Sequence, residues 1–335
     1  MPISGSPALA WTGSQYGLAW VDRRDSNEEV RFMRFDSEGA SRGPSAVIST
    51  EVDYFHPSAL VWDGTVFGLG WEGWGRVFLA RLGADGTVLS TTTTPTTATD
   101  DNPVVVAGNG RGFVLAWRTG AGTTSSVARA FFNSAGAQVG VNEVIADAAA
   151  RVTGDPVISS QADSFGVAWT DMRDGNMEVY FARLDSAGTK SGTDVRVSSA
   201  PELDYYPAIA GCPGGFAVVW SSSARGLIFR QLDLTGRLVG EEVVVDVRPV
   251  LSEVGIAWSS AGYALASRWG GGSLWTAAVR SDGSVTRSLN EVLGGHDFLV
   301  QPGPSIVAAG DIHAAAWSSF EGASDIYFAR ICAVF

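Results

Sequence analysis

Hydrophobic residues in this chain fall into short runs, and one kind of run recurs seven times. In each copy an aromatic or similar residue is followed by small apolar residues and, in all but one copy, by Trp. The copies end at Trp20, Trp71, Trp117, Trp169, Trp220, Ser267 and Trp317, at intervals of 46 to 52 residues. No helical period is visible over a useful length. Strand-like runs that recur at such a period predict an all-β, seven-bladed β-propeller of four-stranded antiparallel blades.

The stretch from Pro156 to Ser199 is the least diverged copy and shows how one blade is built, with its strands lettered A to D in chain order. Strand A opens near a proline, which removes no ladder hydrogen bond at the first residue of a strand. Strand C leads into a tight turn that ends in glycine. The equivalent positions predict blades that start near residues 7, 57, 103, 156, 207, 254 and 304 of a single domain, 1–335.

The seventh copy ends at Phe335, after its strand C. The segment from Pro2 to Ser4 could pair with it as the missing outer strand and so close the ring. Because that segment is short, a three-stranded last blade is the open alternative.

The charge of the chain narrows the range of partners. Its 335 residues carry a formal net charge of −12, whereas proteins that bind nucleic acid present clustered Lys and Arg to the phosphates. Nucleic acid and anionic membranes are therefore not expected partners. No apolar run approaches the roughly 18 residues that suggest a membrane span, so membrane insertion is not expected.

Candidate binding residues lie in the D-to-A and B-to-C connections, which propeller geometry places on one face, the upper face, around the mouth of the central channel. These connections vary most between copies, and variable loops on a rigid scaffold usually carry function. The candidates are Asp53, Tyr54, His56, Asp204, Tyr205 and Tyr206 before strand A, and Trp74, Arg268 and Trp269 after strand B. Aromatic rings beside carboxylates suit sugars and other polyols. The alternative is that these rings only pack blade against blade.

The B-to-C loop of the fourth copy has the most conspicuous local motif, TDMRDGNME. Its polar residues are Asp171, Arg173, Asp174, Asn176 and Glu178, matched in the first copy by Asp22, Arg24, Asp25, Asn27 and Glu29. Such a set could bind a cation or a polar ligand. The favoured interpretation is structural, because an Asp–Arg pair within a loop of turn-forming residues can order that loop.

The tryptophans follow the repeat and indicate packing. Six of the twelve end strand B, and Trp11, Trp62 and Trp258 end strand A. Both positions are expected to fill the space between blades. Cys212 and Cys332 fall two blades apart, beyond the roughly 7 Å between Cα atoms that a disulfide allows, so both are expected to be free thiols.

The segment WTDMRDGNMEVYFARLD, from Trp169 to Asp185, resembles the repeat of bacterial extracytoplasmic propellers related to the BNR or Asp-box group. Weaker copies extend this similarity over nearly the whole chain. The resemblance implies a secreted, periplasmic or cell-surface propeller, in a group that includes sialidases and many binding modules. No signal peptide is visible in the chain as given. The turns LGADGTVLS and RSDGSVTRS lack the Trp that closes a sialidase Asp box, so no catalytic residue is carried over.

The leading hypothesis is a non-catalytic, lectin-like recognition module that binds a glycan or a small polar molecule at the upper face. A protein-interaction scaffold is the second hypothesis. The third is a glycosidase- or lyase-type enzyme that uses channel-mouth carboxylates and a histidine as acid or base: Asp53, Asp101, Asp155, Asp204 and His56. No nucleophile turn or metal-ligand spacing appears. No catalytic residue or metal ligand is therefore assigned, no cofactor is expected although calcium stays open, and a monomer is expected.

Overall fold

The computed structural model describes residues 5–22, 28–52, 59–96, 103–120, 122–146, 148–248, 253–269, 273–293, 303–310, 312–320 and 324–332. This part of the chain is all-β apart from two short 3-10 turns, Gly122–Thr124 and Ala148–Ala150. Within it, no helix is long and apolar enough to cross a membrane.

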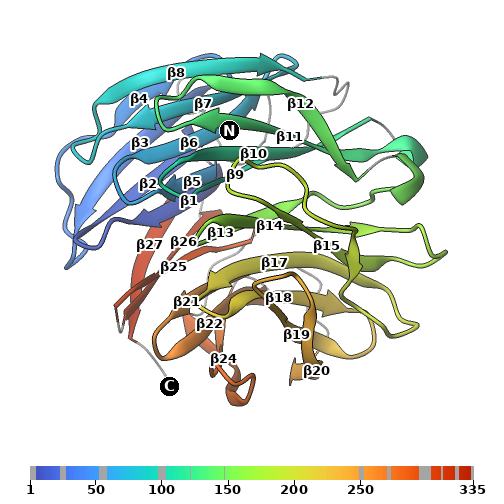
Figure 1. Cartoon of the computed structure of the whole chain (residues 1–335). Coiled ribbons are helices and arrows are strands. Elements are labelled where there is room, and N and C mark those ends of the chain that lie inside the picture. Colours follow the sequence, from blue (N-terminus) through green and yellow to red (C-terminus); the bar gives the residue numbers. More distant parts are fainter. Residues whose placement is uncertain are drawn as a thin grey trace.

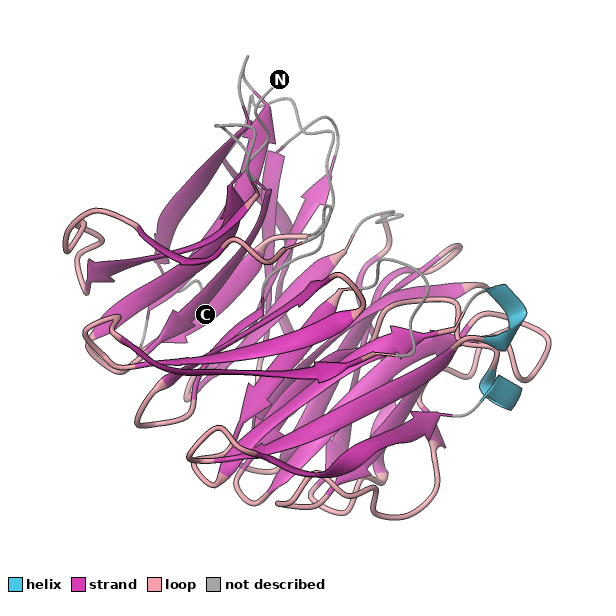
Figure 2. Ribbon diagram, turned by 90° about the horizontal axis from the view of Figure 1, so that it is seen from above, coloured by secondary structure: helices cyan, strands magenta, loops and turns pink. Residues whose placement is uncertain are grey.

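Seven antiparallel sheets, one for each blade, are arranged in a ring, as predicted (Figures 1 and 2). Blades one and two comprise β1 (Gly5–Trp11), β2 (Gln15–Asp22), β3 (Glu29–Asp36), β4 (Ala46–Ser49), β5 (Ala59–Trp62), β6 (Phe67–Gly73), β7 (Arg76–Leu82) and β8 (Val88–Pro95). Blades three and four comprise β9 (Val104–Gly108), β10 (Gly112–Thr119), β11 (Ser126–Asn133), β12 (Gln138–Ala146), β13 (Val157–Gln161), β14 (Ser164–Asp171), β15 (Glu178–Leu184) and β16 (Val195–Arg196).

Blades five to seven continue the same pattern. They comprise β17 (Asp204–Cys212), β18 (Gly215–Ser222), β19 (Gly226–Asp233), β20 (Leu238–Asp246), β21 (Val254–Ser259), β22 (Gly262–Trp269), β23 (Ser273–Val279), β24 (Val285–Leu293), β25 (Ser305–Ala309), β26 (Ile312–Phe320) and β27 (Ser324–Cys332). Blade seven therefore has three described strands, and β1 of blade one packs against its β25 and β26. Residues 2–4, which were expected to complete blade seven, lie outside the described residues.

Two of the prolines that were expected to open strand A lie inside it. Pro7 falls at a register shift in β1, and Pro207 falls at a register shift in β17. Pairing with strand B resumes on both sides of each shift, so these strands begin a few residues earlier than predicted. A bulge can hold a residue that lacks an N–H, because the bulged residue makes no ladder bond.

One face of strand B carries large side chains and the other face carries small ones. This asymmetry lets one blade pack against the next. In β6 the large residues, including Phe67 and Trp71, pack against blade one. The small residues face blade three, where a Cβ on Gly68 would lie only 2.4 Å from the ring of Phe113. The aromatic residue at the start of one strand B thus occupies the space that a glycine leaves on the preceding blade.

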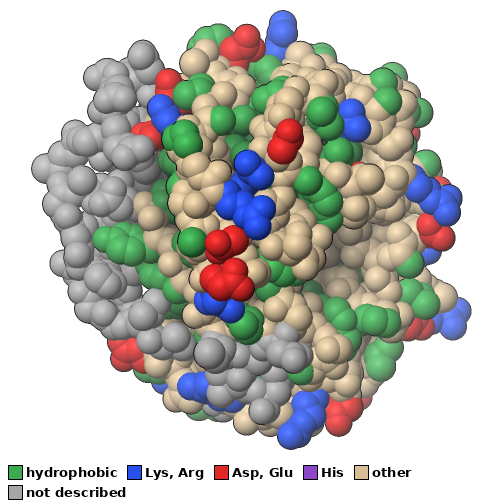
Figure 3. Space-filling view, turned by 90° about the vertical axis from the view of Figure 1, so that its left-hand side faces the viewer, with side chains coloured by type: hydrophobic (Ala, Val, Ile, Leu, Met, Phe, Trp, Pro, Cys, Tyr) green, Lys and Arg blue, Asp and Glu red, His purple; other side chains and the backbone are tan. Residues whose placement is uncertain are grey.

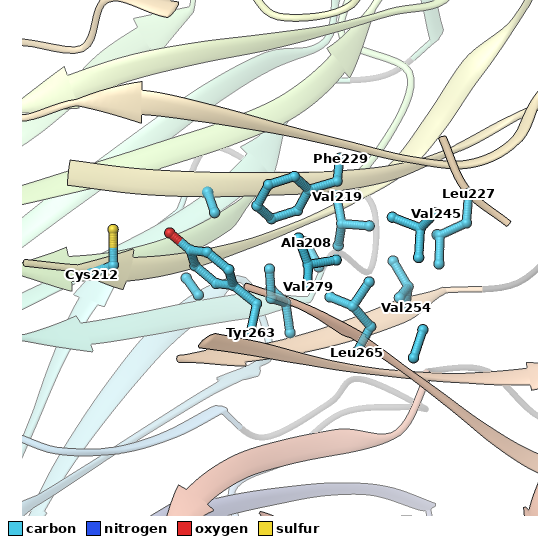
Figure 4. Packing of buried hydrophobic residues seen from close by; sticks show 14 residues of the cluster. Ala208, Cys212, Val219, Leu227, Phe229, Val245, Val254, Tyr263, Leu265 and Val279 are labelled. Atoms are coloured by element: carbon cyan, nitrogen blue, oxygen red, sulfur yellow. The ribbon is translucent and has the colours of Figure 1, made fainter. Parts of the chain in front are cut away.

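The same contact recurs around the ring. A Cβ on Gly17 would lie 2.6 Å from the ring of Phe67, and a Cβ on Gly166 would lie 2.8 Å from the ring of Phe216. Between blades five and six, Ala217 occupies the place of the glycine and belongs to the same cluster as Tyr263. Figure 4 shows how Tyr263 packs in this cluster. The blades therefore interlock through the large face of one sheet and the small face of its neighbour.

The tryptophans divide into two groups. The six that end strand B are between 0% and 7% exposed, which fits the predicted packing role: Trp20, Trp71, Trp117, Trp169, Trp220 and Trp317. Trp11, Trp62 and Trp258, at or one residue before the end of strand A, are only partly buried and line the central channel as well as contacting the blades. The expectation that these three only fill the space between blades was therefore incomplete, because the innermost strand has the channel on one side.

Charged side chains of both signs are interspersed on the side of the molecule drawn in Figure 3. Many of them form ion pairs within one blade, such as Arg31 with Asp22 at 3.3 Å and Arg129 with Glu143 at 2.5 Å. Inside the fold, Cys212 is a buried free thiol, as predicted. The side chain of Cys332 lies outside the described part.

Replacing Gly68 with Ala should lower the free energy of unfolding by about 1–3 kcal/mol, because the new methyl group would overlap the buried ring of Phe113. Gly70→Ala is the matched control in the same strand and on the same face. A Cβ on Gly70 would lie 3.5 Å from its nearest neighbour, which is an ordinary contact. Guanidinium unfolding followed by tryptophan fluorescence measures both variants, and equal stabilities would contradict the proposed interlock.

Candidate ligand-binding site

A pocket of about 260 Å³ opens between blades four and five at the upper face. Its walls come from the loop before β13, from β14, from the β14–β15 loop and from β17. The lining residues are Thr153, Gly154, Thr170, Met177, Tyr205 and Tyr206. This upper pocket therefore contains two of the predicted binding residues, Tyr205 and Tyr206.

A bulge in β17 gives these two tyrosines their positions. Tyr206 has a φ of 54° and precedes Pro207 at the register shift, a conformation that a bulky residue rarely adopts. The Tyr206 side chain is 36% exposed, and its ring stands nearly perpendicular to that of Tyr205, with ring centroids 5.1 Å apart. Backbone strain of this kind persists only where the surroundings enforce it, and it is frequent at binding sites.

Hydrogen bonds from blade four hold the beginning of β17 in place. The Asp204 amide donates to the Met177 carbonyl at 3.0 Å. The Asn176 side chain donates to the Glu202 carbonyl at 2.6 Å and to the Pro201 carbonyl at 3.0 Å. The blade-four loop therefore positions the tyrosine wall of the pocket.

The pocket also contains a buried hydroxyl group without a hydrogen-bond partner. Thr170 is 2% exposed, and its Oγ1 has no partner among the described residues. Its backbone carbonyl, in contrast, accepts hydrogen bonds from the Thr153 amide at 2.9 Å and the Gly154 amide at 3.3 Å. A Cβ on Gly154 would lie 3.2 Å from Thr170 Cβ, so glycine keeps this side of the pocket open. A buried hydroxyl without a partner costs about 1–3 kcal/mol. Because the Thr170 oxygen is buried in the pocket wall, a ligand oxygen can satisfy it once the side chain rotates toward the pocket.

The DMRDGN loop beside the pocket is held by its own ion pairs. Asp171 accepts hydrogen bonds from Trp169 Nε1 at 3.0 Å and from Arg173 Nε at 2.9 Å. Arg173 also donates to Asp194 at 2.9 Å, and its guanidinium lies 4.1 Å from the ring centroid of Tyr180. Burial raises the pKa of Asp171, and the hydrogen bonds from Arg173 oppose this rise. These contacts favour the structural interpretation of the motif.

Asp204, a predicted ligand residue, is fully buried and does not line the pocket. Burial raises the pKa of Asp204 to about 6, and Ser222 and the charge of Arg225 oppose the rise. The nearest guanidinium nitrogen of Arg225 lies 3.6 Å from its carboxylate, and Arg225 also pairs with Glu242. Asp204 therefore supports the base of the tyrosine wall instead of contacting a ligand in the pocket.

The other predicted residues lie elsewhere in the fold or outside the described residues. Trp74 is 66% exposed in the tight turn between β6 and β7, with a φ of 51°, and does not line the upper pocket. Arg268 and Trp269 lie in strand β22 and not in the loop after it, because pairing with β23 extends to Trp269; their side chains are not described. Asp155 pairs with Arg118 at 3.1 Å. The remaining candidates, Asp53, Tyr54, His56 and Asp101, lie outside the described residues.

Four of the six lining residues give no functional indication in the sequence: Thr153, Gly154, Thr170 and Met177. Thr170 directly follows the repeated Trp169, and Met177 ends the DMRDGN loop. Their role is visible only after the two blades are placed side by side. Among the described residues, no group of three or more His, Cys, Asp and Glu side chains could hold a metal ion.

Comparison with known proteins supports the fold. No protein-family model matches the chain, and neither does any curated protein. The polysaccharide lyase Uly1 matches 98% of this chain and 90% of its own, with a TM-score of 0.63 and 8% sequence identity. A subtype N10 neuraminidase-like protein of the little yellow-shouldered bat isolate from Guatemala matches 100% of this chain and 95% of its own, with a TM-score of 0.52 and 9% sequence identity. The SapL1 lectin, solved with α-methyl fucoside, matches 85% of this chain and 96% of its own, with a TM-score of 0.51 and 13% sequence identity.

At these identities the similarity establishes the β-propeller fold. The resemblance to the BNR or Asp-box group stays a prediction, because it rests on the sequence motif alone.

The raised pKa of Asp204 predicts a specific dependence of stability on pH. The pKa of Asp204 is about 6 in the folded protein and 3.8 in an ordinary aspartate. Between these two pH values the folded protein keeps a proton on Asp204 that the unfolded chain releases. The free energy of unfolding therefore falls as pH rises from about 4 to about 6, and the loss persists above that range.

Asp204→Asn should remove this loss and be more stable than the wild type at about pH 7.5, by on the order of 1–3 kcal/mol. The difference should vanish near pH 3.5, where both side chains are neutral. Urea unfolding of both proteins across this pH range measures the difference. A difference in unfolding free energy between Asp204→Asn and the wild type that does not change with pH would contradict the raised pKa of Asp204.

Proposed function

We propose that this protein is a recognition module that binds the ring of a neutral sugar, or a similarly small polar molecule, in the upper pocket between blades four and five. The observation that carries this proposal is the combination of Tyr205, Tyr206 and the unpartnered Thr170 hydroxyl in one pocket. Aromatic rings bind the apolar faces of a sugar, and a fixed hydroxyl group binds one of its oxygens.

The chemistry of the lining supports an uncharged ligand. None of the six lining residues is charged. The nearby carboxylates already face cations: Asp171 pairs with Arg173, and Asp204 faces Arg225. The pocket thus offers polar groups and aromatic surface without a net charge to attract or repel an ion.

Two of the solved structures that share the fold are described by carbohydrate chemistry, one as a polysaccharide lyase and the other as a lectin with α-methyl fucoside. These two structures are compatible with the proposal. They are not evidence for it, because the lyase and the lectin are only 8% and 13% identical in sequence to this chain. The alternatives of a protein-interaction scaffold and of an enzyme that uses His56 stay predictions.

Tyr206→Ala should weaken binding of the best ligand on a glycan array by about tenfold or more, because loss of one aromatic contact costs about 1–2 kcal/mol. Thr170→Val keeps the shape of the side chain and removes only the hydroxyl group, so it should also weaken binding. Gly154→Val should fill the pocket and abolish binding. Isothermal titration with the glycans that bind on the array gives the affinities.

Trp74→Ala is the control, because it removes an exposed aromatic residue of the same face in blade two. It should leave the affinity unchanged. Loss of binding in Trp74→Ala with full binding in Tyr206→Ala would place the site elsewhere on the upper face. A silent array together with a co-purifying protein would favour the scaffold instead.

A further inference from the structure

The lower face, where strands A end, has a cavity of its own in the central channel. It measures about 290 Å³ and is lined by the inner strands of six blades. Trp11, Trp62 and Trp258 stand at its lower end, since Trp11 and Trp62 are the last residues of their A strands and Trp258 is the last but one of β21. The proposed sugar site is on the opposite face.

These three tryptophans depart from the repeat at one defined position. Each pairs in register with the first aromatic residue of strand B, and the paired rings lie 4.4, 4.8 and 4.7 Å apart in blades one, two and six. In the other four blades the same position holds a small residue: Gly108, Ser160, Gly211 or Ala308. Because four blades pack well with a small residue there, blade packing alone does not require Trp.

A second cavity of about 370 Å³ lies beside the first, between blades five and six. It is formed by turns and strand ends of the lower face, including Cys212 and Tyr263, which face each other in Figure 4. Trp258 lines both cavities. The channel cavity and the cavity between blades five and six therefore share the Trp258 side chain as a common wall.

The lining of both cavities contains no charged side chain among the described residues, although the chain has a net charge of −12. Polar groups are nevertheless present. Gln231 donates its side-chain N–H groups to the Tyr263 hydroxyl at 3.1 Å and the Ser281 carbonyl at 3.0 Å, so its Oε1 is left as an acceptor. The inner strands are also edge strands of their sheets, and their channel edges offer backbone N–H and C=O groups.

We propose that the lower face is a second binding site, which takes a short uncharged chain of two ring units, of the neutral oligosaccharide type. One ring occupies the channel against the tryptophans, and the other occupies the crevice between blades five and six. Trp258 contacts both rings, and Gln231 Oε1 accepts a hydrogen bond from a ligand hydroxyl. This site is separate from the upper pocket and does not depend on the function proposed there.

The test uses cellobiose, maltose and chitobiose as probes, with saturation-transfer NMR and calorimetric titration of the whole protein. At least one disaccharide should bind the wild type, and Trp258→Ala should weaken it at least tenfold. Gly214→Phe is a second variant that removes no packing, because a Cβ on Gly214 meets no atom within 4 Å and the residue lines the crevice. It should block binding by filling the space.

The titrations are repeated in a Tyr206→Ala background, which removes binding at the upper pocket, and Trp74→Ala, at an exposed residue that lines neither site, is the control that should leave disaccharide binding unchanged. A hyaluronan disaccharide, which carries a carboxylate, should bind at least tenfold more weakly than the neutral probes. The proposal is overturned if no neutral disaccharide binds, or if Gly214→Phe binds as well as the wild type. Binding that Tyr206→Ala abolishes and both lower-face variants retain would also overturn it, while supporting the upper pocket.

Discussion

The alternation of large and small side chains along strand B is the constraint on which the rest of this structure depends. An aromatic residue on one blade fills the space above a glycine or alanine on the preceding blade, as Phe113 does above Gly68. Each buried aromatic side chain contributes on the order of 2–3 kcal/mol. Because each blade presents the opposite face to its next neighbour, the contact continues from blade to blade and the sheets form a ring.

A rigid ring makes local departures from the repeat informative. The upper pocket exists because β17 has a bulge at Pro207 that turns Tyr206 out of the strand, while the blade-four loop fixes the beginning of the same strand. The lower cavities depend on tryptophans at a position where other blades have small residues. In both cases the shared core carries the stability, and the exceptions are free to form a binding surface.

Most of the fold could be predicted from the sequence, because a period near 50 residues and the recurring strand B run fix both the class and the blade count. The site could be predicted only in part. Tyr205 and Tyr206 were visible as aromatic departures from the repeat, but Thr170 and Gly154 look ordinary until blade five lies beside them. Asp204 was expected to contact a ligand, yet the pleat of β17 turns it into the interior.

The central claim is that the upper pocket holds a sugar ring against Tyr205 and Tyr206. The most direct measurement is a crystal structure of the protein soaked with a methyl glycoside that binds it in solution. The account predicts ligand density in the upper pocket against the wall formed by Tyr205 and Tyr206, with a sugar oxygen about 2.7–3.2 Å from Thr170 Oγ1. A glycoside that is well ordered elsewhere on the molecule, with the upper pocket holding only water, would contradict the claim.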